Sequence, residues 1–210
     1  ILTMTYTVAA TDEMRQRFRA QFPGADADRL TFCTINSLSN RIIGFYGKTY
    51  GRNTFRLAEE GEILSLLGEI YQRVNEDYAT TGILRDIRTN ITYVKNQMLS
   101  TEEIRKLKTG IDNFPAIYEQ YRAELLQRRA MDFDDQMVYA KRILEQYPQV
   151  LAAFQNEYRY LCVDESQDTS KIQHSLIRLL VGKSGNLFMV GDEDQSIYGF
   201  RAAYPDALMH

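Results

Sequence analysis

The stretch that decides the predicted fold of this 210-residue chain is Leu161-Cys162-Val163-Asp164-Glu165-Ser166-Gln167-Asp168. It continues an apolar run that begins at Tyr158, and such a run predicts a short buried strand. The strand ends on two adjacent carboxylates, Asp164 and Glu165. Carboxylates at a strand tip suit Mg²⁺ binding and the activation of water, although acidic residues are also common there as loop residues and helix caps.

A second apolar run followed by acidic residues lies further along the chain. Residues 187–190 predict another buried strand, and the acid-rich turn 191–194 follows it. Between the two strands, residues 170–180 predict a helix that Gly182 closes. Strands that alternate with helices predict a parallel sheet covered on both faces, with ligands bound beyond the carboxyl ends of its strands. The sequence therefore predicts an α/β fold with both acidic clusters at one edge.

The beginning of the chain predicts the same kind of structure. Residues 1–6 and 29–35 are rich in β-branched and aromatic residues and predict strands, while a helix is expected up to Phe22. A short helix is expected over 37–45, capped by Asn36 or Ser37. Because the chain starts without Met and inside a strand, we expect it to be part of a longer protein.

The middle of the chain has a helical period instead. Apolar residues recur at three- and four-residue steps from Ile63 to Val74 and from Ile83 to Met98. Ser100 and Glu103 have the spacing of a capping box, and residues 116–129 form a further amphipathic pattern. We therefore expect an all-helical block over residues 46–130.

Composition excludes several classes of protein. The chain is 44% hydrophobic and 25% charged, with a net charge of −3, which is typical of a globular domain rather than a disordered one. No apolar run approaches the roughly 20 residues that a membrane span requires. Two cysteines cannot build a disulfide scaffold or, by themselves, a structural zinc site. With no signal peptide visible, a cytoplasmic location without membrane contact is expected.

Two long motifs resemble a known family. The segments Val163–Thr169 and Val190–Arg201 are similar, in spelling and order, to motifs II and III of the superfamily 1 helicases of the UvrD/Rep/PcrA type. Residues 5–10 and 34–37 resemble motifs Ia and Ib of that family. Residues 131–135 resemble the segment that re-enters its first RecA-like domain. The resemblance is strongest after Asp132 and weakest across 46–130.

The resemblance implies an incomplete RecA-like ATPase domain of the P-loop NTPase type. This domain would comprise residues 1–45 and 131–210, and residues 46–130 would form its helical insertion. Asp164 is then the Walker B carboxylate that binds Mg²⁺, and Glu165 is the base that activates water. Gln167 and Gln195 are expected to be catalytic as well, and Gln195, with Asp164 and Glu165, is expected to contact ATP.

The resemblance also implies a path for single-stranded DNA. Aromatic groups beside a cation suit base stacking with backbone neutralisation, although an aromatic pair can equally belong to a core. The expected DNA-binding residues are Thr5, Tyr6, Thr7, Asn36, Ser37, Tyr198, Phe200 and Arg201. This chain departs from the usual motifs at Val8 and Ala9, where Asn-Lys is typical, at Asn36 in place of His, and at Phe200 in place of Trp.

Two elements that the resemblance leads us to expect, the P-loop and a second RecA-like domain, are missing from the sequence. No G-x-x-x-x-G-K-[ST] P-loop is present, and in the family it precedes motif Ia, while a second RecA-like domain follows motif III. The full-length protein is expected to couple ATP hydrolysis to 3′-to-5′ movement on single-stranded DNA and to duplex unwinding, in DNA repair or replication. The 210 residues alone are expected to be inactive.

Two alternatives remain open at this point. A helicase subunit of the RecB/AddA helicase–nuclease type shares these motifs, and its nuclease domain would lie beyond this chain. A degenerate helicase-like module that serves as a non-catalytic DNA-binding scaffold is the other. The carboxylates Asp164 and Glu165 argue against the scaffold, whereas Val8, Ala9 and Asn36 argue for altered DNA contacts.

Overall fold

The computed structural model describes residues 1–24 and 30–192. The chain divides into two compact units. The sheet unit comprises residues 1–52 and 137–210, and the helix-rich unit comprises residues 53–136. The sheet unit therefore supplies both ends of the chain, with the helix-rich unit between them in sequence.

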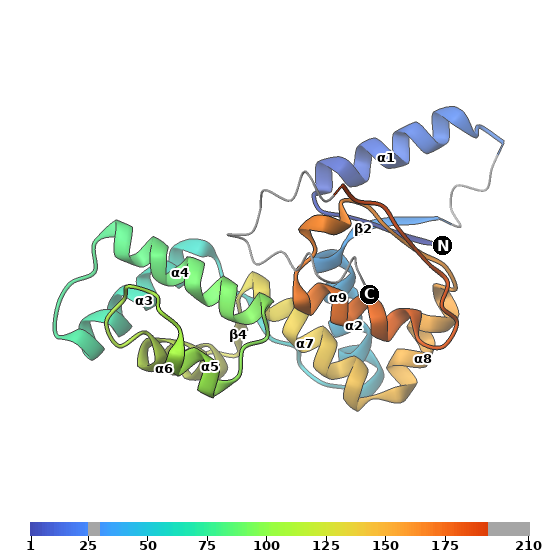
Figure 1. Cartoon of the computed structure of the whole chain (residues 1–210). Helices are drawn as coiled ribbons and strands as arrows, with labels where there is room; N and C mark the ends of the chain where they lie inside the picture. Colours follow the sequence, from blue (N-terminus) through green and yellow to red (C-terminus); the bar gives the residue numbers. More distant parts are fainter. Residues whose placement is uncertain (25–29, 193–210) are drawn as a thin grey trace. The chain divides into compact units, whose positions relative to one another are not determined.

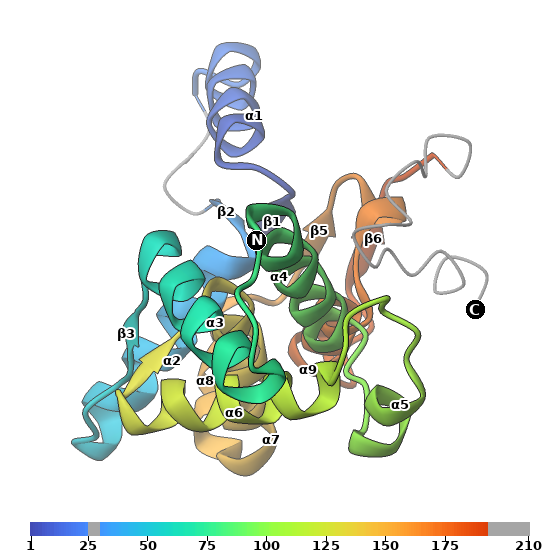
Figure 2. The same cartoon turned by 90° about the vertical axis from the view of Figure 1, so that its left-hand side faces the viewer.

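A parallel sheet organises the sheet unit. Its strands are β1 (Leu2–Thr5), β2 (Thr31–Thr34), β5 (Leu161–Val163) and β6 (Leu187–Met189), in the spatial order β2-β1-β5-β6. Every pairing is parallel, and Figure 2 shows β5 and β6 running side by side. The predicted α/β class with a parallel sheet is confirmed.

Helices pack on the sheet from two sides. Figure 1 shows α1 (Val8–Gln21) on one side of β1 and β2, and α2 (Ile35–Tyr50), α8 (Pro148–Glu157) and α9 (Lys171–Val181) on the other. The helix α7 (Phe133–Gln146) leads into α8. The helix α7 ends at Gln146, and Pro148 starts α8 because proline suits the first turn of a helix.

Two expectations for the sheet unit are corrected. The helix expected over 37–45 continues to Tyr50, and its cap is Thr34, whose hydroxyl accepts the Ser37 N–H, rather than Asn36 or Ser37. The strand β6 is not buried, since Phe188 is 65% exposed. An apolar run predicts burial only where neighbouring elements cover both faces, and β6 is the edge of the described sheet.

The helix-rich unit is mostly, but not entirely, helical. Its helices are α3 (Glu60–Asn75), α4 (Thr81–Asn96), α5 (Thr101–Lys106) and α6 (Phe114–Gln127). Two short strands, β3 (Arg56–Leu57) and β4 (Ala130–Met131), pair in parallel, so the expectation of an all-helical block is wrong in this detail. The predicted capping box is confirmed, because Ser100 and Glu103 bond each other's backbone N–H at the start of α5.

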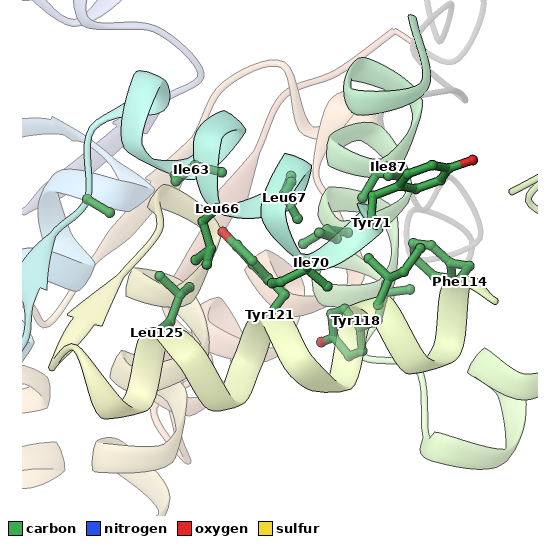
Figure 3. Close-up of a cluster of buried hydrophobic side chains, with 14 of the residues drawn as sticks. Ile63, Leu66, Leu67, Ile70, Tyr71, Ile87, Phe114, Tyr118, Tyr121 and Leu125 are labelled. Carbon is green, nitrogen blue, oxygen red and sulfur yellow. The ribbon is translucent and has the colours of Figure 1, made fainter. Parts of the chain in front are cut away.

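Apolar side chains of α3, α4 and α6 form the core of this unit. Figure 3 shows Ile70 and Tyr71 of α3 beside Ile87 of α4, with Tyr121 of α6 pointing into the same cluster. Ile70, Ile87 and Tyr121 are completely buried, at 0% exposure. The helix-rich unit thus has a hydrophobic core of its own.

Buried charges bind α4 to the segment after β4. The Nζ of Lys95 lies 2.7 Å from a carboxylate oxygen of Asp132 and 2.7 Å from one of Asp135. The Tyr121 hydroxyl donates to Asp132 at 2.8 Å. Burial of unpaired charges would be costly, so each of these groups depends on its partners.

A third carboxylate of this segment, Asp134, also accepts hydrogen bonds from side chains of α4. Asp134 accepts hydrogen bonds from Arg88 at 3.1 Å, Thr92 at 2.8 Å and Asn96 at 3.0 Å, all on α4. Side chains one turn apart on a single helix therefore converge on one carboxylate, which fixes the rotation of α4 about its axis.

The network shifts the pKa of several groups. Burial alone would lower the pKa of Lys95, but the charges of Asp132 and Asp135 outweigh burial and the pKa is raised. Burial raises the pKa of Tyr121, and the neighbouring Asp132 raises it further. Burial also raises the pKa of Tyr118. All three groups therefore hold their protons more tightly in the folded chain.

No helix within residues 1–24 and 30–192 is long and apolar enough to cross a membrane.

The raised pKa values of Lys95, Tyr118 and Tyr121 predict that the folded chain loses stability in alkali. The stabilisation from Lys95, Tyr118 and Tyr121 is complete below their unfolded pKa values of about 10, and it is lost as the pH rises from there through the folded values. Each retained proton contributes a slope of about 1.4 kcal/mol per pH unit. We expect Tyr121→Phe to remove one such increment, measured by denaturant unfolding between pH 8 and pH 11.

Tyr78→Phe is the matched control, since Tyr78 is 77% exposed. It should leave the pH dependence unchanged. A free energy of unfolding that stays constant up to pH 11, or an equal effect of both variants, would contradict the prediction.

Candidate functional site

The carboxyl ends of three parallel strands converge on one small cavity. Thr5 of β1 pairs with Thr34 of β2, and Met4 of β1 pairs with Val163 of β5, so the three strands end at the same level. The cavity there has a volume of about 30 Å³. Its lining comprises Met4, Thr5, Tyr6, Thr34, Ile35, Asn36, Val163, Asp164, Glu165, Thr169 and Gln173.

Two carboxylates lie at this cavity. The backbone N–H of Asp164 donates to the Met4 carbonyl at 3.0 Å, which holds the residue at the tip of β5. Asp164 is half-buried and Glu165 is exposed. The described residues contain no cluster of three His, Cys, Asp or Glu side chains placed for a metal. Mg²⁺ needs only one or two carboxylates when phosphates complete its shell, so Asp164 and Glu165 fit that ion.

The cavity is too small for a nucleotide. A volume of 30 Å³ is that of a water molecule or an ion. The body of a nucleotide would therefore lie outside this cavity.

The turn after β5 has an unusual backbone conformation. Glu165 has a φ of +51°, in the left-handed region that favours glycine. Non-glycine residues in this region cost about 1–3 kcal/mol and cluster at functional sites. The next residue is held by the neighbouring strand, because the Ser166 N–H donates to the Val190 carbonyl at 2.8 Å. A short 3₁₀ turn, η2 (Ser166–Asp168), follows.

Gln167 is buried and does not line the cavity. Its side chain is only 1% exposed and it is absent from the cavity lining. Its Nε2 donates to Glu165 Oε2 at 2.6 Å, and its Oε1 accepts the backbone N–H of Asp192 at 3.1 Å. This amide therefore connects the second carboxylate of the site to the segment that follows β6.

The start of α1 contributes one buried and two exposed side chains. Thr5 is only 4% exposed, and its hydroxyl donates to the Thr7 carbonyl at 3.0 Å and lies 2.6 Å from the Thr11 hydroxyl oxygen. Tyr6 is 40% exposed beside the cavity. Thr7 is exposed and caps α1 by accepting the Ala10 N–H at 3.1 Å. Thr5 is thus enclosed within the fold, whereas Tyr6 and Thr7 face solvent.

The start of α2 lies at the same edge of the sheet. Asn36 is half-buried and lines the cavity, and Ser37 is exposed. Sequence reasoning missed Thr34, Thr169 and Gln173, which also line it. Thr34 and Thr169 were detectable in principle, because each lies inside a segment that resembles a family motif. Gln173 is on α9, and only the packing of that helix brings it to the cavity.

Four expected site residues, Gln195, Tyr198, Phe200 and Arg201, lie outside the described residues.

Neither Cys33 nor His174 offers an obvious nucleophile. Burial raises the pKa of the Cys33 thiol to about 11, so this group stays protonated near neutral pH. Burial lowers the pKa of His174, which is consistent with a neutral packing residue. Asp164 and Glu165 are thus the ionisable carboxylates that line the cavity.

The contact between the turn after β5 and the end of β6 requires glycine at position 191. A Cβ at Gly191 would meet the Ser166 hydroxyl oxygen and would lie 2.7 Å from Gln167 Oε1. We expect Gly191→Ala to lower the free energy of unfolding by about 1–3 kcal/mol. It should also speed hydrogen exchange at the Asp192 amide, which donates to Gln167. Denaturant unfolding and NMR exchange measure the two effects.

Gly44→Ala is the matched control on α2, because no atom lies within 4 Å of the added Cβ. This change should be neutral or should stabilise the helix by up to about 1 kcal/mol. Equal effects of the two substitutions would show that no close approach exists at Gly191.

Comparison with known proteins finds similarity to helicases along the whole chain. The family model described as the UvrD/REP helicase N-terminal domain matches residues 1–210. An ATP-dependent DNA helicase PcrA from Leuconostoc citreum is 33% identical over 213 residues, which is 100% of this chain and 28% of that protein.

Other relatives have the same description. Proteins called ATP-dependent DNA helicase PcrA from Staphylococcus aureus and Staphylococcus epidermidis are each 31% identical over 206 residues, or 97% of this chain. The chain spans about 28% of the length of these relatives. With a family model that covers every residue, the chain belongs to the UvrD/REP helicase family, and the matched region is the N-terminal domain of that family.

Proposed function

We propose that this chain is part of a longer ATP-dependent DNA helicase, one that couples ATP hydrolysis to 3′-to-5′ movement on single-stranded DNA and to duplex unwinding. The observation that carries the proposal is the position of Asp164 and Glu165, directly after β5 and beside the converging ends of β1 and β2. The relatives described as ATP-dependent DNA helicases support it. A role in DNA repair or replication, in the bacterial cytoplasm or nucleoid, is part of the same proposal.

The domain organisation follows from the order of the two units. We assign the sheet unit to the first RecA-like domain and the helix-rich unit to its insertion. The family resemblance puts the domain at residues 1–45 and 131–210 and the insertion at 46–130, whereas the two compact units divide at 52/53 and 136/137. The sheet unit lies on both sides of the helix-rich unit in sequence, which supports an insertion. A P-loop and a second RecA-like domain from the same polypeptide would complete the ATP site.

The carboxylates have distinct roles in this proposal. Asp164 would hold Mg²⁺, which when bound supplies positive charge next to the phosphate oxygens of ATP. Glu165 is exposed at the cavity, so its carboxylate can accept a proton from the water that attacks the terminal phosphate. Gln195 is assigned to contact that phosphate.

The proposed DNA contacts use the starts of α1 and α2. The first N–H groups of a helix favour phosphate, and exposed Thr7 and Ser37 lie at these two helix starts. Tyr6 offers an exposed ring on which a base can stack. Thr5 is assigned a supporting role, because its hydroxyl bonds within the start of α1. Asn36 contributes an amide, and Tyr198, Phe200 and Arg201 are assigned to the same path.

The alternatives have less support. A non-catalytic scaffold would not need a carboxylate pair at a strand tip, and both members of that pair line the cavity. A helicase–nuclease subunit would differ outside this chain, and no described residue favours it over a simple helicase.

Replacement of Glu165 tests the proposed base. In the full-length protein, Glu165→Gln should lower the rate of ATP hydrolysis at least about 100-fold, because the amide cannot accept the proton. Nucleotide affinity should be retained, since the side chain keeps its size. Steady-state hydrolysis and a fluorescent-nucleotide titration measure the two properties. Glu145→Gln on the surface of α7 is the control and should not change hydrolysis; near-normal hydrolysis by Glu165→Gln would remove Glu165 from this role.

The isolated chain offers a second test. Residues 1–210 include the carboxylates but no P-loop sequence. We expect this chain alone, with Mg²⁺ and single-stranded DNA added, to hydrolyse ATP no faster than its own Glu165→Gln variant. Release of phosphate well above that control would contradict the proposed division of the site between this chain and other parts of the protein.

A further inference from the structure

Gln167 cannot act on a bound nucleotide directly. Its side chain is 1% exposed and does not line the cavity, so the direct catalytic role expected from the sequence does not fit its position. Both ends of its amide are hydrogen-bonded inside the protein. Whatever Gln167 contributes to the reaction must therefore pass through a neighbouring group.

The neighbour that faces the cavity is Glu165. A glutamate side chain has several rotatable bonds and, when exposed, samples many positions. The side-chain Nε2 of Gln167 donates to Glu165 Oε2 at 2.6 Å, a short bond of the kind that a charged acceptor makes. The backbone of Glu165 itself is in the left-handed region, with a φ of +51°. The hydrogen bond from Gln167 thus holds Oε2 of the Glu165 carboxylate, whereas Oε1 takes no part in this bond.

The other end of the amide makes the position of Gln167 definite. Its Oε1 accepts the Asp192 N–H at 3.1 Å, and only the oxygen of an amide can accept while only its nitrogen can donate. The side chain therefore has one orientation that satisfies both partners. The bond from Ser166 N–H to the Val190 carbonyl, at 2.8 Å, holds the same two segments together.

We propose that Gln167 is a positioning residue that holds the Glu165 carboxylate in its reactive orientation by bracing it against the backbone that follows β6. The inference rests on the proposed function, in which Glu165 accepts the proton of the attacking water. Removal of the brace should lower kcat and leave KM for ATP nearly unchanged, because Gln167 does not line the cavity.

The experiment measures ATP hydrolysis by the full-length protein. Gln167→Met keeps the length of the side chain and removes both hydrogen bonds. We expect kcat to fall about 10- to 100-fold, the range typical of a side chain that orients a functional group. Gln167→Glu is a second variant, which keeps an acceptor for the Asp192 N–H but cannot donate while ionised. It should show a similar loss of kcat even if Gln167→Met proves unstable.

Gln155→Met is the matched control. Gln155 is on α8 and donates to the Leu179 carbonyl at 2.8 Å, so this change also removes a side-chain-to-backbone bond within the sheet unit. It lies outside the cavity lining and should leave kcat unchanged.

A double-variant cycle separates positioning from general support of the fold. Glu165→Asp shortens the carboxylate so that it no longer reaches Gln167. In that background Gln167→Met should cause a much smaller further loss of kcat than it does alone. The proposal would be overturned if Gln167→Met lowered kcat by the same factor in the Glu165→Asp background as it does alone. It would also be overturned if a rise in KM, rather than a fall in kcat, accounted for the slower hydrolysis.

The outcomes also separate this inference from the proposed function. If Glu165 variants lose hydrolysis while Gln167→Met and Gln167→Glu keep the kcat of the unmodified protein, only the positioning role is overturned. If Glu165 variants keep hydrolysis, both the base assignment and the positioning role are overturned.

Discussion

The parallel pairing of β1 with β2 and β5 is the constraint on which the rest of the site depends. Parallel strands end at one edge, and the register places Thr5 opposite Thr34 and Met4 opposite Val163. The bond from the Asp164 N–H to the Met4 carbonyl extends the pairing one residue beyond the strand. The segment before α1, the start of α2, and Asp164 and Glu165 after β5 therefore lie at one cavity that none of these segments forms alone.

The acidic tip is held by interactions with the end of β6 rather than by the strand itself. A chain that leaves β5 through a left-handed residue, Glu165, stays in that conformation only if its surroundings compensate for the cost. Ser166 and Gln167 supply hydrogen bonds to the backbone at Val190 and Asp192. The conformation of the reactive turn thus depends on a strand that comes more than twenty residues later.

Part of this structure follows from local sequence. The apolar run before Asp164 predicts β5, and the pair Ser100 and Glu103 predicts the start of α5, because strand burial and helix capping are decided over a few residues. The carboxylates of the site were found in the same way, since their position after a strand is visible in the sequence. Tyr6 and Asn36 were singled out only through the family resemblance, as DNA-binding residues, and the fold brings both to the cavity.

The remainder depends on contacts between distant segments. The exposure of Phe188 could not be read from an apolar run, because it is decided by what covers β6. The cap of α2 is Thr34 because β2 ends at Thr34, one residue earlier than expected, and the helix begins directly after it. Gln167 was expected in the active site because the motif contains it, and only the fold shows that it is buried and does not line the cavity.

The acidic residues of the second half of the chain also show what sequence alone cannot decide. Asp132 and Asp134 are buried among Lys95 and Arg88 of α4, which they bind across about forty positions of sequence. Asp164 faces a cavity instead. Both groups contribute to the same excess of negative charge in the sequence, and both lie in segments that resemble family motifs. What separates a structural carboxylate from a reactive one is the partner that the fold brings to it: a buried cation neutralises the first, whereas the second is left available for a ligand.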